Sequence, residues 1–97
     1  MYARVASFEG ADGDALRSST DELKERAKSG PPEGVPAAGF TMLIEPDSGR
    51  SISIVLFETE EDLRAGDAAL NEMNPGSDAA GKRTTVETFE VAIDVRV

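Results

Sequence analysis

The fold is decided by residues 36–58, which read PAAGFTMLIEPDSGRSISIVLFE. Two apolar, strand-like runs flank the linker PDSG at residues 46–49. Proline fixes φ at the start of such a turn, and glycine supplies the positive φ that the turn needs at its end. A connection this short joins antiparallel neighbours, so residues 36–45 and 50–58 are predicted to form a β-hairpin.

The chain before the hairpin supplies a strand and a helix. Residues 2–8 are rich in β-compatible side chains and are predicted to form a strand. A helix is predicted over residues 15–28, because the carboxylate of Asp12 or Asp14 can accept hydrogen bonds from the free N–H groups of its first turn. Gly30 suits the left-handed residue that ends the helix.

The chain after the hairpin repeats this order in reverse. Thr59 is predicted to cap a second helix, which ends at the Asn-Pro-Gly sequence of residues 74–76. Gly66, on the buried side of that helix, permits close packing. Residues 77–83 are predicted to form a loop, and residues 84–97 alternate over a long final strand.

The resulting order, β-α-β-β-α-β, predicts one α+β domain over residues 1–97, a ferredoxin-like plait. Right-handed crossovers place both helices on one face of a four-stranded antiparallel sheet. The other face must meet water or protein, yet the hairpin strands carry apolar side chains on both sides, as at Leu43, Val55 and Leu56. We expect this face to pack against a second copy in a homodimer, with an open, partly apolar sheet as the alternative.

Composition excludes several functions. The 97 residues contain no Cys and no His, which excludes disulfides, thiolate metal sites and a hydrolytic triad. The net charge of -9 predicts that neither nucleic acid nor a membrane is a partner, because phosphate groups are repelled. The N-terminus has no signal-peptide pattern and no apolar run approaches the ~20 residues of a membrane span, so a cytoplasmic location is expected.

Several segments together resemble the dimeric α/β-barrel superfamily, and in particular its antibiotic-biosynthesis-monooxygenase-like domains. The segments are the turn at residues 9–13, the helix end at Gly30, residues 39–44, the hairpin turn at residues 47–50, and residues 57–63 leading into the second helix. The resemblance implies that two plaits pack sheet to sheet, with a pocket between each sheet and its helices. Members include cofactor-free oxygenases of aromatic polyketides, heme-degrading enzymes and small-molecule isomerases.

The chain departs from the catalytic residues of those families. Heme-degrading members resemble one another in a ligating His near the second helix, and this chain has none. The oxygenases use a Trp and an Asn in the pocket; this chain lacks Trp, and its Asn residues, Asn71 and Asn74, lie at the end of the second helix. Arg4 falls near the place of the first-strand Asn. The catalytic residues are therefore left unassigned, and a monooxygenase-like oxidoreductase is the activity that the resemblance implies.

Arg4 is the most informative candidate for a binding residue. On a central strand, its guanidinium could hold a carboxylate or enolate through two hydrogen bonds. The alternatives are an ion pair with a strand acid such as Glu90, or an exposed position near the chain end. Further candidates for the wall of an apolar pocket are Tyr2, Phe40, Met42 and Phe57, although aromatic and Met residues on strands are more often plain core.

The acidic residues do not indicate a metal site. The run at residues 58–62 is explained by the positive end of the helix dipole. Glu90 and Asp94 lie on the more polar face of the last strand and are expected to be solvated or interfacial. The sequence thus predicts no metal and no cofactor.

Two functions remain open. The first is a small-molecule enzyme or binder for a hydrophobic, aromatic and anionic compound, without metal or heme. The second is a non-catalytic dimeric domain with an assembly or stress-related role, whose cavity is filled. An open cavity of several hundred Å³ next to Arg4, of the size common in ligand sites, would favour the first.

Overall fold

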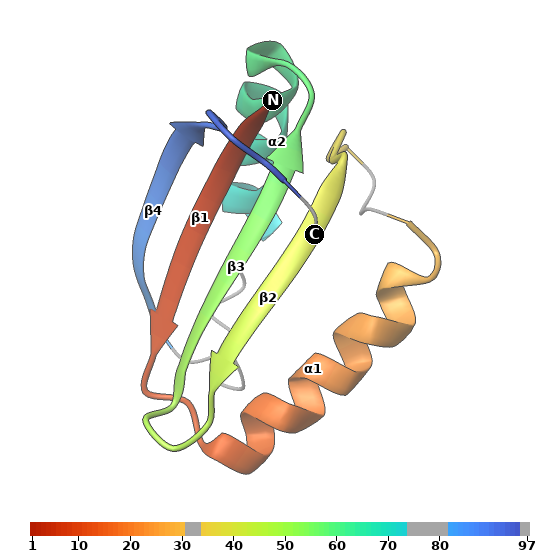
Figure 1. The fold of residues 1–97 in the computed structure, drawn as a ribbon. Coiled ribbons are helices and arrows are strands. Elements are labelled where there is room, and N and C mark those ends of the chain that lie inside the picture. The colour runs from red at the N-terminus through yellow and green to blue at the C-terminus, as the bar shows by residue number, and fades with distance from the viewer. Residues whose placement is uncertain (31–33, 74–81, 96–97) are drawn as a thin grey trace.

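The computed structural model describes residues 1–30, 34–73 and 82–95 and has the expected βαββαβ order. The four strands form one antiparallel sheet in the order β2-β3-β1-β4, so β3 and β1 are central (Figure 1). The ferredoxin-like plait is therefore confirmed. Its elements are β1 (Tyr2–Glu9), α1 (Gly13–Ala27), β2 (Gly39–Glu45), β3 (Arg50–Phe57), α2 (Glu60–Met73) and β4 (Lys82–Glu90).

The helix caps and the hairpin turn follow the local sequence. Asp12 Oδ2 accepts a hydrogen bond from the backbone N–H of Ala15 at 3.3 Å, and Thr59 Oγ1 accepts one from that of Asp62 at 3.0 Å. Both predicted caps are confirmed, with Asp12 rather than Asp14 at the first helix. The hairpin turn is confirmed as well, because Gly49 has φ +70°.

Helix α2 packs on the two central strands. The buried core next to it consists of Val35, Val55, Phe57 and Leu63, and Phe57 is fully buried. Gly66 faces the Phe57 ring so closely that a Cβ atom added there would lie 2.3 Å from Cε1. The predicted role of Gly66 in close packing is confirmed.

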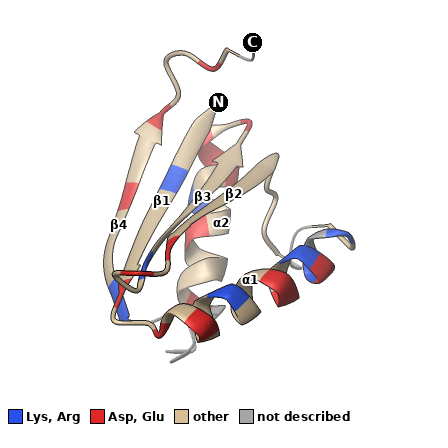
Figure 2. Ribbon diagram, turned by 60° about the horizontal axis from the view of Figure 1, so that its bottom comes forward, with Lys and Arg blue, Asp and Glu red and all other residues tan. Residues whose placement is uncertain are grey.

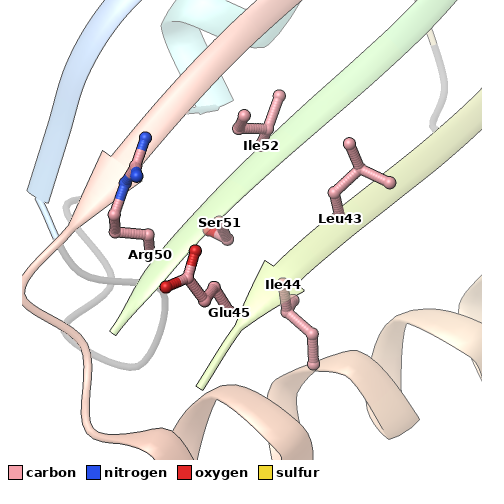
Figure 3. A pocket seen from close by; sticks show the side chains of 6 residues that line it. All are labelled: Leu43, Ile44, Glu45, Arg50, Ser51 and Ile52. Atoms are coloured by element: carbon pink, nitrogen blue, oxygen red, sulfur yellow. The ribbon is translucent and has the colours of Figure 1, made fainter. Parts of the chain in front are cut away.

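The strand register separates the two faces of the sheet. Tyr2 lies opposite Phe57, and Arg4 lies opposite Val55, so these side chains share the face that α2 covers. Helix α1 flanks β2 on that side: Ile44 of β2 points toward α1 in Figure 3. No helix of the described residues covers the opposite face (Figure 1).

The last strand differs from the prediction at both ends. It begins at Lys82, so Arg83 belongs to β4 and not to a loop. It ends at Glu90, far short of the predicted end at residue 97. The pairing with β1 ends where the Val91 N–H donates to the Met1 carbonyl at 2.9 Å. Residues 92–95 pair with no strand of the described chain. The expected helix end at residues 74–76, the loop at 77–81 and residues 96–97 lie outside the described residues.

No helix among the described residues is both long and apolar enough to pass through a bilayer.

Candidate functional site

Arg4 is a nearly buried cation between the sheet and α2. Only 4% of its surface is exposed. Its Nε donates to Asp67 Oδ1 at 2.7 Å, and its Nη2 donates to Asn71 Oδ1 at 3.0 Å. The alternative of a structural ion pair is correct, but its expected partner, a strand acid such as Glu90, is wrong. The acid is Asp67 of α2, and Glu90 lies opposite Tyr2. The alternative of an exposed Arg4 is also wrong.

Helix periodicity and close packing bring these two partners to Arg4. Asp67 and Asn71 are four residues apart and therefore occupy one side of α2. Gly66 allows α2 to approach the Phe57 ring, and the neighbouring Asp67 thereby comes within reach of β1. A buried cation without partners is costly, so the carboxylate and the amide oxygen are what make this position tolerable.

A second arginine joins the cluster from β4. Arg83 Nη1 donates to Asn71 Oδ1 at 3.0 Å, the same oxygen that Arg4 contacts. Its orientation depends on a register shift: Ser7 pairs with Thr85, but Phe8 pairs with Arg83, so one residue of β4 is skipped. The shift places Arg83 on the Phe8 side of the sheet, the side of α2.

We name Arg4, Asp67, Asn71 and Arg83 the arginine cluster. It contains two cations and one carboxylate, so its formal charge is positive in a chain whose net charge is -9. Figure 2 shows a basic position within β1 and basic positions at the start of β4, where Lys82 precedes Arg83. Charged hydrogen bonds of this kind are stronger than neutral ones.

The other predicted site residues are distributed over the same face. Tyr2 is half-buried and packs against the core, and Phe57 is a fully buried part of it. The structure thus brings Tyr2, Arg4 and Phe57 together. Met42 and Phe40 lie on β2; Phe40 is 48% exposed and pairs with Val55, which separates it from Arg4.

A shallow hollow of about 250 Å³ lies elsewhere, at the β2–β3 hairpin (Figure 3). None of the five predicted ligand-binding residues lines it. Its walls are Leu43, Ile44, Glu45, Arg50, Ser51 and Ile52.

The acidic run lies where the sequence placed it, with Glu60, Glu61 and Asp62 in the first turn of α2. Glu60 forms an ion pair with Arg64 one turn later, and the Asp62 N–H is held by the Thr59 cap. Among the described residues, no group of three or more acidic side chains is arranged to hold a metal ion.

Sequence pattern and topology thus define a ferredoxin-like α+β domain with a four-stranded antiparallel sheet. Among solved structures, the chain is similar to the heme-degrader MhuD from Mycobacterium tuberculosis, whose structure holds two hemes in its active site. The two share 18% identity with a TM-score of 0.64, over 99% of this chain and 100% of that one. No family model and no curated protein matches the sequence. The likeness confirms the fold that the sequence resemblance implied.

The residues of the arginine cluster do not fit a heme iron. Proteins hold that iron with His, Cys, Met or Tyr; this chain has no His and no Cys, and neither Met nor Tyr is a member of the cluster. The groups that converge between β1 and α2 are two guanidiniums, a carboxylate and an amide, and guanidinium is a donor that cannot ligate a cation. We therefore derive no chemistry through heme for this chain.

Proposed function

We propose that this chain binds a hydrophobic aromatic small molecule on the α2 side of its sheet, next to Arg4, without metal or heme. The supporting observation is the burial of Arg4 on a central strand. When a buried ion pair is replaced by apolar residues of similar volume, the stability of a protein often stays the same or rises. Folding alone therefore does not require Arg4, whereas recognition of a polar group on an apolar ligand does.

Tyr2 and Phe57 form the pair next to Arg4 and Val55 on the same face of the sheet. Phe57 is 0% exposed and its ring packs on Gly66, so a ligand can reach it only when α2 moves away from β3. We therefore expect binding to displace α2. Phe40 and Met42 extend the apolar surface across β2 and remain predicted ligand contacts.

A binding screen tests this proposal. Anthrones, quinols and naphthalene derivatives are titrated into the protein and followed by calorimetry and thermal stabilisation. Arg4→Met, which keeps an extended side chain without the charge, should abolish binding. Arg64→Gln is the matched control, because Arg64 is exposed and bonds only with Glu60 on the same helix. Heme is included, and no iron-ligated Soret spectrum is expected. The proposal fails if no aromatic compound binds or if Arg4→Met binds as the wild type does.

The monooxygenase-like activity implied by the resemblance is a separate proposal. It is tested by oxygen uptake and product analysis with any anthrone or quinol that binds. Product formation that depends on Arg4 would support it. Binding without oxygen uptake would leave a binding protein.

A second candidate function is favoured by one observation: the guanidinium of Arg4 is already held by Asp67 and Asn71, and Phe57 fills the core beside it. This arrangement suits a non-catalytic dimeric domain with an assembly or stress-related role. It predicts that an Arg4→Met, Asp67→Leu double variant keeps its stability and its oligomeric state. Loss of ligand binding in the same variant would argue for the first function.

We also propose that two copies assemble through the face opposite α2. That face bears Leu43 and Phe89, each 50% exposed, beside half-buried apolar side chains of β1 and β3. Residues 91–95 extend away from the sheet on the same side (Figures 1 and 2), and Ile93 and Val95 are 82% and 70% exposed. Together these are the apolar surfaces that association would remove from water.

The oligomeric state tests this assembly. Sedimentation at micromolar concentration should give a dimer for the wild type. Leu43→Asp should give a monomer, because it places a charge on the apolar face proposed as the interface. Leu43 is exposed, so its replacement spares the core. Arg17→Asp, on the exposed side of α1, is the control for an added carboxylate. A monomeric wild type would refute the proposal.

The acidic charge bears on other partners. A net charge of -9 continues to argue against nucleic acid and anionic membrane surfaces. The cytoplasmic location expected from the sequence stays a prediction.

A further inference from the structure

Two arginines share one neutral oxygen in the arginine cluster. Arg4 Nη2 and Arg83 Nη1 each lie 3.0 Å from Asn71 Oδ1. Asp67 balances the charge of Arg4, whereas Arg83 forms no ion pair among the described residues. Two like charges directed at a single uncharged acceptor leave a positive potential at that point.

The register shift of β4 shows that Arg83 is held there by the backbone. Skipping one residue between the pairs Ser7–Thr85 and Phe8–Arg83 turns Arg83 to the α2 side of the sheet. The Thr84 hydroxyl donates to the Ser7 carbonyl at 3.2 Å, at the irregularity itself. Irregularities of this kind re-aim a side chain at sheet edges and next to active sites.

From this geometry we infer that the position of Asn71 Oδ1 is an oxyanion site, and that the aromatic ligand carries a carboxylate that occupies it. An amide oxygen carries only a partial charge, while a carboxylate offers two charged oxygens to two guanidiniums at once. Asn71 is exposed, so its side chain can turn to solvent when the carboxylate enters. The inference rests on the proposed function and specifies its ligand class as aromatic carboxylates.

Two naphthalene derivatives of the same shape test the charge. Naphthalene-2-carboxylate and its neutral carboxamide are titrated by calorimetry into wild type, Arg83→Gln, Asn71→Ala and the control Arg64→Gln. Inorganic phosphate and sulfate are titrated in parallel, because they report an anion site that needs no ring. All variants are first compared by circular dichroism.

In the wild type and in Arg64→Gln, the carboxylate should bind about tenfold more tightly than the carboxamide, the factor typical of one charge-assisted hydrogen bond. Arg83→Gln should remove this preference and leave carboxamide binding unchanged. Asn71→Ala should bind the carboxylate several-fold more tightly than the wild type does, because the competing amide oxygen is gone. If Asn71 were only a structural bridge, Asn71→Ala would instead lower both the carboxylate affinity and the stability of the protein, which would contradict the inference.

The outcomes separate this inference from the proposed function. Equal affinity for carboxylate and carboxamide in the wild type overturns the inference and leaves an aromatic binding site. Binding of phosphate or sulfate that depends on Arg83, without binding of either naphthalene compound, supports the oxyanion site and contradicts the aromatic ligand. If none of the four compounds binds, both are overturned.

Discussion

Replacement of Gly66 by alanine tests the packing that holds α2 against the sheet. A Cβ atom at this position would lie 2.3 Å from Phe57 Cε1 and 2.4 Å from Cζ. Ordinary contact begins at 3.4 Å, so ring and helix must separate by about 1 Å. The Phe57 ring is 0% exposed and belongs to the core cluster, which leaves it no open space to enter.

Two opposing effects decide the sign. Alanine in place of glycine inside a helix stabilises it by about 1 kcal/mol. Overpacking a filled core costs roughly 1–3 kcal/mol, and a displacement of about 1 Å for a fully buried ring falls in the upper part of that range. The clash should therefore exceed the helix term, and Gly66→Ala should lower the free energy of unfolding by about 1–2 kcal/mol. For a domain of this size, Tm should fall by roughly 5–15 °C.

Urea and thermal denaturation at one fixed protein concentration measure this change, since the stability of the proposed dimer would depend on concentration. Ala65→Gly, at an exposed position of α2, is the control and isolates the helix term, at a cost of about 1 kcal/mol. Phe57→Leu in the Gly66→Ala background should recover part of the loss, which a double-mutant cycle detects. A Gly66→Ala protein that is more stable than the wild type would refute the reasoning.

Two further substitutions test polar groups in the interior. Asp67→Asn keeps the shape of the side chain but leaves the charge of Arg4 uncompensated. Because Asp67 is 37% exposed, we expect urea denaturation to show a loss of about 2 kcal/mol, less than for a fully buried pair. Unchanged stability would contradict the ion pair. Ser51→Ala should be neutral or stabilise by up to about 1 kcal/mol, because among the described residues no hydrogen-bond partner reaches the buried Ser51 Oγ; a clear loss would mean that this hydroxyl has a bound partner such as water.

The fold could be predicted because its determinants are local. The hairpin turn requires Gly49 in the positive-φ region, and the caps require Asp12 and Thr59 at the starts of their helices. The end of β4 could not be predicted, since alternation continues to Val97 in the sequence while pairing stops at Glu90. A strand needs a neighbour, and the alternation of one segment says nothing about where its neighbour ends.

Only part of the candidate site could be predicted from the sequence, for a related reason. Arg4 could be identified because a cation on a central strand is unusual and needs an explanation. Asp67 and Asn71 are ordinary polar residues of a helix surface, and only the docking of α2 turns them toward β1. Arg83 was missed because a skipped residue in a strand register leaves no mark in the sequence.

The contacts between α2 and the sheet make ligand exchange at Asn71 physically reasonable. Three positions on this helix face the strands: Gly66 packs on Phe57, Asp67 pairs with Arg4, and Asn71 bridges two arginines. An anion that displaces Asn71 removes only the last of these, at the exposed end of the helix. While only the anionic group is bound, the apolar contact and the ion pair still hold α2 in place, so the oxyanion site can open before the ligand ring displaces α2 from Phe57.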